Sequence, residues 1–126
     1  MNAEALQWCE YARENLEVAR LSLERNLFNA SLQNAQQAVE KSLKALLLTA
    51  GRDIPRTHNI RELMRLAREA DVSIELSVDE CDLLDAIYIP SKYPVFGVLP
   101  GGVADRETCH RCLGIAERVV GNLSSI

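Results

Sequence analysis

One stretch, residues 28–50, constrains the fold more than any other part of the chain. Its apolar residues recur at steps of three and four, and they are Phe28, Leu32, Ala35, Val39, Leu43, Leu46 and Ala50. This period is typical of an α-helix with one buried face. A second apolar row, made of Ala38, Ala45 and Leu48, widens that face. We therefore expect this helix to lie at the centre of a bundle and to contact several other helices.

Polar residues run between the two apolar rows, and two of them form a candidate ion pair. The polar positions are Gln33, Gln36, Gln37, Glu40, Lys41 and Lys44. Glu40 precedes Lys44 by one turn, which is the favourable order for a pair of opposite charges on a helix. Two interpretations stay open: the pair belongs to a polar network beneath a binding loop, or it is an ordinary surface pair.

Further helices are expected on both sides of the central one. A first helix over residues 2–26 carries an apolar stripe and should form an antiparallel hairpin with the central helix. Glycine tolerates the left-handed conformation that follows many helices, so Gly51 should end the central helix. A third helix, capped by Thr57 or Asn59, is expected to run to about Ala70.

The second half of the chain predicts two more helices separated by a long loop. Residues 77–80 read Ser-Val-Asp-Glu, which is a capping box that opens a fourth helix through about Tyr88. Prolines and glycines then exclude a regular helix over residues 89–103, and Asp105 can cap the last helix. The prediction is an all-α fold: a single domain over residues 1–126, built as an up-and-down bundle of about five helices.

Charge and hydropathy limit which kinds of partner the protein can bind and in which compartment we expect it. The formal net charge of −4 argues against a generally basic nucleic-acid-binding protein. One basic surface remains, in which Arg61, Arg65 and Arg68 share the outer face of the third helix. It is either a solvated face partly neutralised by nearby glutamates or a dock for RNA, phosphate or an acidic partner. Without a signal peptide or a membrane-spanning apolar run, we expect a cytoplasmic protein that binds no membrane.

The four cysteines do not predict a metal site. Cys109 and Cys112 have the two-residue gap of zinc sites, but they fall within a predicted helix. Cys9 and Cys81 stand alone in other helices. We expect all four thiols to pack in the core as small, weakly polar groups. Neither a metal nor a cofactor is predicted.

Three blocks of the sequence together resemble a known family. They are residues 35–47 (AQQAVEKSLKALL), residues 57–60 (THNI) and residues 88–94 (YIPSKYP). In this order and spacing they resemble the HEPN domain (higher eukaryotes and prokaryotes nucleotide-binding), and the resemblance covers essentially the whole chain. It is similar to the small stand-alone prokaryotic members, which are often encoded beside a minimal nucleotidyltransferase.

The resemblance implies a helical bundle that forms homodimers, with a nucleotidyltransferase, RNA or a nucleotide as possible partner. In many members an Arg and a His, separated by four to six residues, form a metal-independent ribonuclease, and some members act as toxins in toxin–antitoxin pairs. This sequence departs from that pattern. Lys92 stands where the arginine is common, and the positions expected for the histidine are Gly97, Val98 and Leu99. None of these three can act as a general acid or base. No catalytic residue is therefore predicted.

Six residues are candidates for ligand binding: Tyr88, Lys92, Tyr93, Glu40, Lys44 and His58. Two tyrosines and a lysine in a proline-containing loop could stack on a base and pair with a phosphate. The alternative is that both rings pack on the end of the bundle while Lys92 pairs with an acid such as Glu40. For His58 the favoured interpretation is a structural histidine that hydrogen-bonds across a helix end. Arg52 and His58 match the ribonuclease spacing, but away from the family's site, so we interpret that match as chance.

Three functional hypotheses follow. The first is a non-catalytic, homodimeric module that binds a nucleotide, RNA or protein and works with a minimal nucleotidyltransferase. The second is a metal-independent ribonuclease toxin with a degenerate or rearranged site. The third is a dimeric scaffold without a small ligand.

Overall fold

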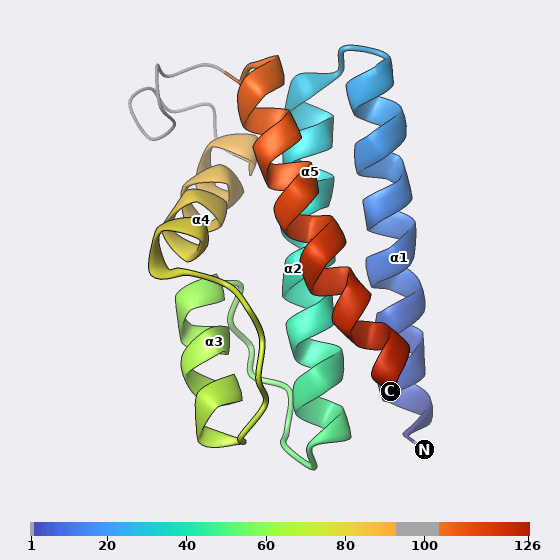
Figure 1. Ribbon diagram of the computed structural model, residues 1–126, viewed down its shortest axis with the longest axis vertical. Helices are drawn as coiled ribbons and strands as arrows, with labels where there is room; N and C mark the ends of the chain where they lie inside the picture. Colours follow the sequence, from blue (N-terminus) through green and yellow to red (C-terminus); the bar gives the residue numbers. More distant parts are fainter. Residues whose placement is uncertain (1, 93–103) are drawn as a thin grey trace.

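The computed structural model describes residues 2–92 and 104–126, and the side chains of residues 89–92 and 125 lie outside that description. The described chain folds into five α-helices without a strand, so the predicted all-α bundle is confirmed (Figure 1). The helices are α1 (Ala3–Glu24), α2 (Phe28–Thr49), α3 (Ile60–Glu69), α4 (Val78–Lys92) and α5 (Arg106–Gly121), and a short 3-10 helix, η2 (Asn122–Ser125), follows the last.

Helix α2 lies at the centre, as its two apolar rows predict. It packs against α1, α3, α4 and α5. Figure 1 shows α5 crossing obliquely in front of α2 toward α1, whereas α3 and α4 follow one another along the other flank of α2. Leu32, Val39 and Leu43 are fully buried, while Phe28 and Leu46 are partly buried. The prediction for Ala50 is wrong: it is exposed, because the helix ends at Thr49 and Ala50 is its C-cap.

Local capping patterns gave correct helix starts. The Asn59 side chain accepts a hydrogen bond from the Glu62 amide (2.8 Å), which decides between the two predicted caps of α3. Ser77 and Glu80 exchange bonds at 3.1 and 2.9 Å, as a capping box requires. Asp105 accepts from the Thr108 amide at 2.7 Å. Gly51, at φ +81°, has the left-handed conformation expected after α2.

The prediction for the end of α4 is wrong. We expected irregular chain from Ile89 onward, but α4 continues through Pro90 to Lys92. Proline lacks one amide donor, yet its ring holds φ near a helical value, so a single proline near a helix end need not stop it. The rest of the expected loop, residues 93–103, lies outside the described residues.

Two further observations concern the thiols and the membrane. All four cysteines are free and buried, so the prediction that they pack in the core is confirmed. Burial raises the pKa of the Cys112 thiol to about 12. Across the described residues, every helix is too short or too polar to cross a lipid bilayer.

Candidate functional site

A buried ion pair forms the base of the candidate site on α2. The Nζ atom of Lys44 lies 3.0 Å from Oε2 of Glu40, and the two side chains are only 7% and 4% exposed. Of the two interpretations left open for this pair, the ordinary surface pair is therefore wrong. Two buried charges cost several kcal/mol each in lost hydration, so the surrounding groups must stabilise them.

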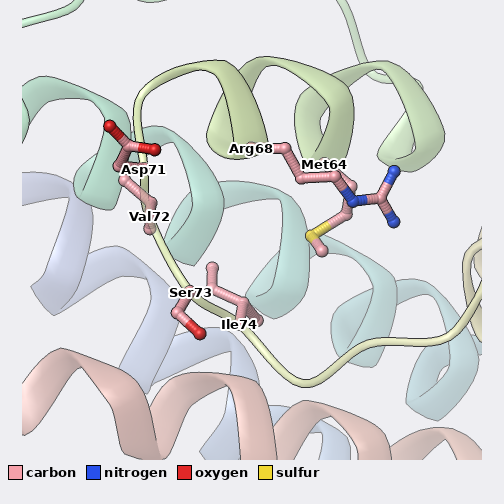
Figure 2. A pocket seen from close by; sticks show the side chains of 6 residues that line it. All are labelled: Met64, Arg68, Asp71, Val72, Ser73 and Ile74. Carbon is pink, nitrogen blue, oxygen red and sulfur yellow. The ribbon is translucent and has the colours of Figure 1, made fainter.

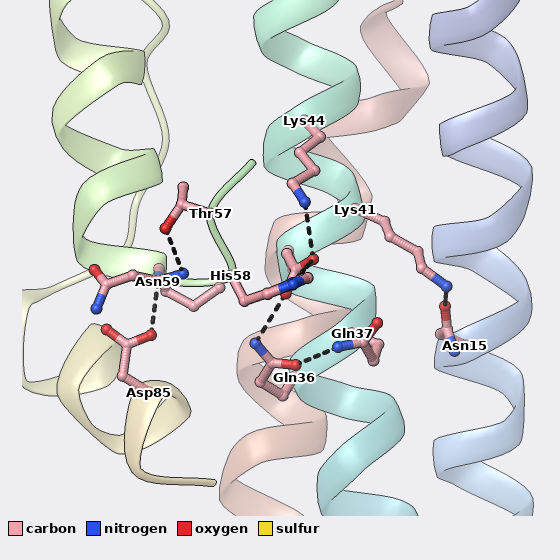
Figure 3. Close-up of polar contacts among 11 residues, drawn as sticks. Asn15, Gln36, Gln37, Lys41, Lys44, Thr57, His58, Asn59 and Asp85 are labelled. Carbon is pink, nitrogen blue, oxygen red and sulfur yellow. Dashed lines mark hydrogen bonds and ion pairs between the residues drawn. The ribbon is translucent and has the colours of Figure 1, made fainter. Parts of the chain in front are cut away.

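Neighbouring side chains complete this polar network (Figure 3). The amide of Gln36 donates to the second oxygen of Glu40 (3.4 Å), and Gln37 donates to Gln36 (2.7 Å). On the other side, Lys44 Nζ lies 5.6 Å from the centre of the Trp8 ring on α1, within the range of a cation–π contact. Each buried side-chain oxygen or nitrogen in the described residues has a hydrogen-bond partner.

His58 connects the buried pair to the surface. Its Nδ1 atom lies 3.0 Å from Oε2 of Glu40, while its side chain is 54% exposed. A carboxylate can only accept, so Nδ1 donates and Nε2 is the acceptor of the neutral ring. The hypothesis of a histidine that bonds across a helix end fits in part, because His58 lies just before the N-cap of α3 but its partner is on α2.

The His58 ring stacks on Tyr88 of α4. The ring centres are 5.0 Å apart and the planes differ by 16°. The structure thus brings together four of the six predicted residues: Glu40, Lys44, His58 and Tyr88. Lys92 is the last residue of α4, but its side chain is outside the described part of the structure, as is the whole of Tyr93.

Asp85 fixes the start of α3, and with it His58, against α4. Its carboxylate accepts from the amides of Ile60 (2.6 Å) and Arg61 (3.3 Å), which are free donors at the N-terminus of α3. Burial raises the pKa of Asp85, and these two hydrogen bonds oppose that shift. Sequence analysis missed Asp85, because the contact joins residues 25 positions apart and leaves no local pattern.

A second polar group adjoins the site, where Lys41 of α2 contacts side chains of α1. Lys41 Nζ lies 2.7 Å from the Asn15 side-chain oxygen and 5.7 Å from the centre of the Tyr11 ring. Burial lowers the pKa of Lys41. Tyr11 and Trp8 meet edge to face, with ring centres 6.5 Å apart. Sequence analysis missed these two aromatic neighbours, because they come from the helix beside α2.

The arginines of α3 form the solvated face that one interpretation expected. Arg65 bonds to Glu62 at 2.5 Å and to Glu69 at 2.6 Å, and all three side chains are at least 41% exposed. Those bonds raise the pKa of Arg65 and lower that of Glu62. Arg61 lies 3.5 Å from Asp82. Neutralised in this way, Arg61 and Arg65 make a poor dock for an anion.

A depression of about 400 Å³ lies away from this site, at the far end of α3. Met64 and Arg68 line it from the helix, and the connector that follows α3 lines it with residues 71–74 (Figure 2). It is wide open and borders none of the six predicted residues, so its size alone does not indicate a binding site.

Two further predicted features can be placed. Arg52 donates to the backbone oxygen of Glu69 at the C-terminal end of α3, whereas His58 precedes the N-terminal end. The two therefore do not form a pair, in agreement with the interpretation that their spacing is chance. His110, to which we assign no role, is exposed on α5. Within the described residues, no three histidine, cysteine or acidic side chains come together to hold a metal ion.

Comparison with known proteins adds the family. The family model described as HEPN domain matches residues 5–126. The crystal structure of TT1696 from Thermus thermophilus is similar at 28% identity and a TM-score of 0.75, with 99% of this chain and 98% of that chain covered. The crystal structure of ST0689, an archaeal HEPN homologue, is similar at 23% identity and a TM-score of 0.72, covering 96% and 95%. No curated protein matches the chain.

Proposed function

This chain belongs to the HEPN domain family, and from that premise we propose that it is a non-catalytic, homodimeric binding module of the cytoplasm. Its ligand is a nucleotide or single-stranded RNA, and its protein partner is a minimal nucleotidyltransferase, as in a toxin–antitoxin pair. The proposed binding residues are Tyr88, Lys92, Tyr93, Glu40, Lys44 and His58.

The observation that carries this proposal is the stack of His58 on Tyr88 above a buried ion pair. Removing Glu40 and Lys44 from water costs free energy that a purely structural helix face need not spend. The pair holds an imidazole whose side chain is 54% exposed. A base can stack on such a ring, with its polar edge near Nε2. Lys92 and Tyr93, a cation and a second ring, are assigned to the same site from the sequence alone.

Binding is tested by titrating the protein with nucleoside monophosphates and short single-stranded RNA. Stacking on one aromatic ring contributes about 1–3 kcal/mol, so His58→Leu should weaken binding by roughly fivefold to a hundredfold. His110→Leu is the matched control, because it removes an exposed histidine on α5. Equal affinity in both variants, or no binding by the parent protein, would contradict the proposed ligand site.

One observation favours the ribonuclease as a second candidate. Glu40 orients His58 through Nδ1 and leaves Nε2 as a potential base, which is the arrangement of a carboxylate–histidine pair in hydrolytic enzymes. RNA cleavage that persists in EDTA and is lost in His58→Ala would establish this second candidate and overturn the non-catalytic proposal. If the parent protein cleaves RNA in EDTA and His58→Ala still does so, His58 is not the catalytic base and the non-catalytic proposal is also wrong.

The nucleotidyltransferase partner is tested separately. If the gene beside this one encodes a minimal nucleotidyltransferase, the two proteins should co-purify at equal stoichiometry when expressed together. Separate elution at micromolar concentration would reject that partner. The third hypothesis, a dimeric scaffold, requires a stable dimer that binds neither nucleotide nor RNA.

A further inference from the structure

The outer face of α1 carries an unusual share of exposed apolar surface. Among the described residues, six large hydrophobic side chains are exposed, and four of them lie on α1: Leu6, Tyr11, Val18 and Leu21. These side chains are 38–51% exposed on a helix that packs against α2 and α5. At about 3.6 residues per turn, Tyr11, Val18 and Leu21 share one side of α1, whereas Leu6 lies on another. Figure 1 shows α1 at the edge of the bundle.

Exposed residues on this face follow a heptad-like spacing. Glu4, Tyr11, Glu14, Val18, Leu21 and Arg25 are separated by seven, three, four, three and four positions, and all six are exposed. Alternating steps of three and four place residues in one seam of an α-helix, as in two-stranded coiled coils. We call this row the α1 seam.

We propose that the α1 seam is the contact surface for a second copy of this chain, with the two α1 helices antiparallel. This proposal rests on the homodimer of the proposed function and names the face and register that form it. The register follows from the seam itself, because Tyr11 and Val18 are centred on the same point of the helix as Glu4 and Arg25, between residues 14 and 15. A two-fold axis at that point places Tyr11 on the second copy's Val18 and Glu4 on its Arg25.

The charges at the two ends of the seam are available for that contact. Among the described residues, neither the Glu4 carboxylate nor the Arg25 guanidinium takes part in an ion pair. An antiparallel dimer would pair them twice, once at each end. A parallel dimer would instead place Glu4 beside Glu4 and Arg25 beside Arg25, which repel.

Grooves beside Tyr11 fit the apolar part of the contact. One groove of about 140 Å³ is lined by Glu4, Gln7, Trp8 and Tyr11. In the proposed register, Leu21 of the second copy lies over Trp8, at this groove. A second groove of about 140 Å³ lies on the other side of Tyr11, toward Val18 and Lys41. The seam therefore offers shape as well as charge.

The size of the seam sets the expected affinity. Helix α1 has 22 residues, which is a length of about 33 Å. A contact through one helix pair lies at the small end of specific interfaces, so we expect a dimer with a dissociation constant on the order of micromolar. Analytical ultracentrifugation of the full chain over a range of concentrations measures it.

The first test places a lysine in the seam. Val18→Lys should weaken the dimer by about tenfold or more, because a charge then faces Tyr11 in a desolvated contact. Val78→Lys is the matched control, since Val78 is a similarly exposed valine on α4, and it should leave the dissociation constant unchanged. Circular dichroism melts confirm that both variants are folded.

The second test exchanges the charges at the ends of the seam. Glu4→Arg and Arg25→Glu should each weaken the dimer by roughly threefold to tenfold, because two repelling pairs replace two attractive ones. The double variant Glu4→Arg/Arg25→Glu should recover the parent value, since it restores both pairs in reverse. Only the antiparallel register predicts this recovery. If the double variant associates as weakly as the single variants, that register is wrong.

A third change should strengthen the dimer. Glu14 lies closest to the proposed axis and would face the second copy's Glu14, so Glu14→Gln should tighten association by about twofold to fivefold. A parent dimer that all these variants leave unchanged would overturn the α1 seam but keep the proposed homodimer. A parent protein that is monomeric at high micromolar concentration would refute both.

Discussion

The Glu40–Lys44 pair on α2 and the Glu62–Arg65–Glu69 group on α3 combine the same kinds of charge at helical spacing, but their surroundings are opposite. The first pair is 4–7% exposed and the second group is 41–59% exposed. Spacing along a helix thus predicts that the charges meet, but it does not predict what covers them. The cover decides the energetics, because water screens an exposed pair and leaves a buried one to its protein partners.

The largest expected effect comes from breaking the buried pair. Glu40→Leu leaves the Lys44 ammonium buried without its counter-charge, so it should lower the free energy of unfolding by about 3–5 kcal/mol. Urea denaturation followed by circular dichroism measures this change.

A double variant sharpens the interpretation of that loss. Replacing both charges, as in Glu40→Leu/Lys44→Met, should recover most of the stability, because a buried ion pair and a well-packed apolar pair are often equivalent. If the double variant is no more stable than Glu40→Leu, the loss comes from misplaced His58 or from packing rather than from an unpaired charge.

Asp85 is intermediate in burial and should be intermediate in effect. Asp85→Ala leaves the amides of Ile60 and Arg61 without their acceptor, at an expected cost of about 1–2 kcal/mol in the free energy of unfolding. Asp82→Ala is the control on the same helix, because Asp82 is exposed and its one ion pair among the described residues is with Arg61 at 3.5 Å. Equal losses in the two variants would show that burial does not separate them.

The pH dependence of the partly exposed Glu80–Arg118 pair tests how burial affects the strength of an ion pair. The hydrogen bond that Arg118 donates to Glu80 lowers the pKa of Glu80 below the ordinary 4.5. A carboxyl whose pKa is lowered by folding stabilises the native state above its unfolded pKa and loses that contribution as the pH falls through the folded pKa. Arg118→Gln should therefore cost about 0.2–1 kcal/mol at neutral pH.

The difference between the parent protein and Arg118→Gln should narrow as the pH falls below 4.5. Some difference should remain in acid, because Arg118 also donates to the backbone oxygen of Glu75. Urea denaturation at a series of pH values measures both effects. A difference that is constant from neutral to acid pH would assign the whole effect to that backbone bond.

The smallest effect is expected for the exposed group on α3. Glu62→Gln should leave the thermal midpoint unchanged within error, because solvent replaces what Arg65 loses. A loss comparable to that of Asp85→Ala, measured by differential scanning calorimetry, would mean that the α3 surface is covered in the native assembly.

The sequence predicted features that depend on a few neighbouring residues. The helical period that begins at Phe28, the capping box at Ser77 and the cap at Asp105 are local patterns, and the structure confirms all three, apart from Ala50 at the end of α2. The end of α4 was mispredicted because Pro90 was interpreted as a helix terminator, although its fixed φ is compatible with a helix.

The site was only half predictable for a different physical reason. Glu40, Lys44, His58 and Tyr88 were identified one by one, but their contacts join α2, the residue before the α3 cap and α4. The contact between His58 and Glu40 joins residues 18 positions apart, and no local pattern encodes it. Asp85 and Trp8 were missed for the same reason, since each acts across helices.

The central position of α2 should also determine the order in which the helices unfold. Because α2 packs against all four other α-helices, its backbone cannot become exposed to solvent unless most of the core unfolds. Within the described residues, helix α3 packs mainly against α2 and α4, so it can detach in a partial fluctuation. Hydrogen–deuterium exchange should then rank the amides: those in the middle of α2 exchange at the rate of global unfolding, and those of α3 exchange earlier.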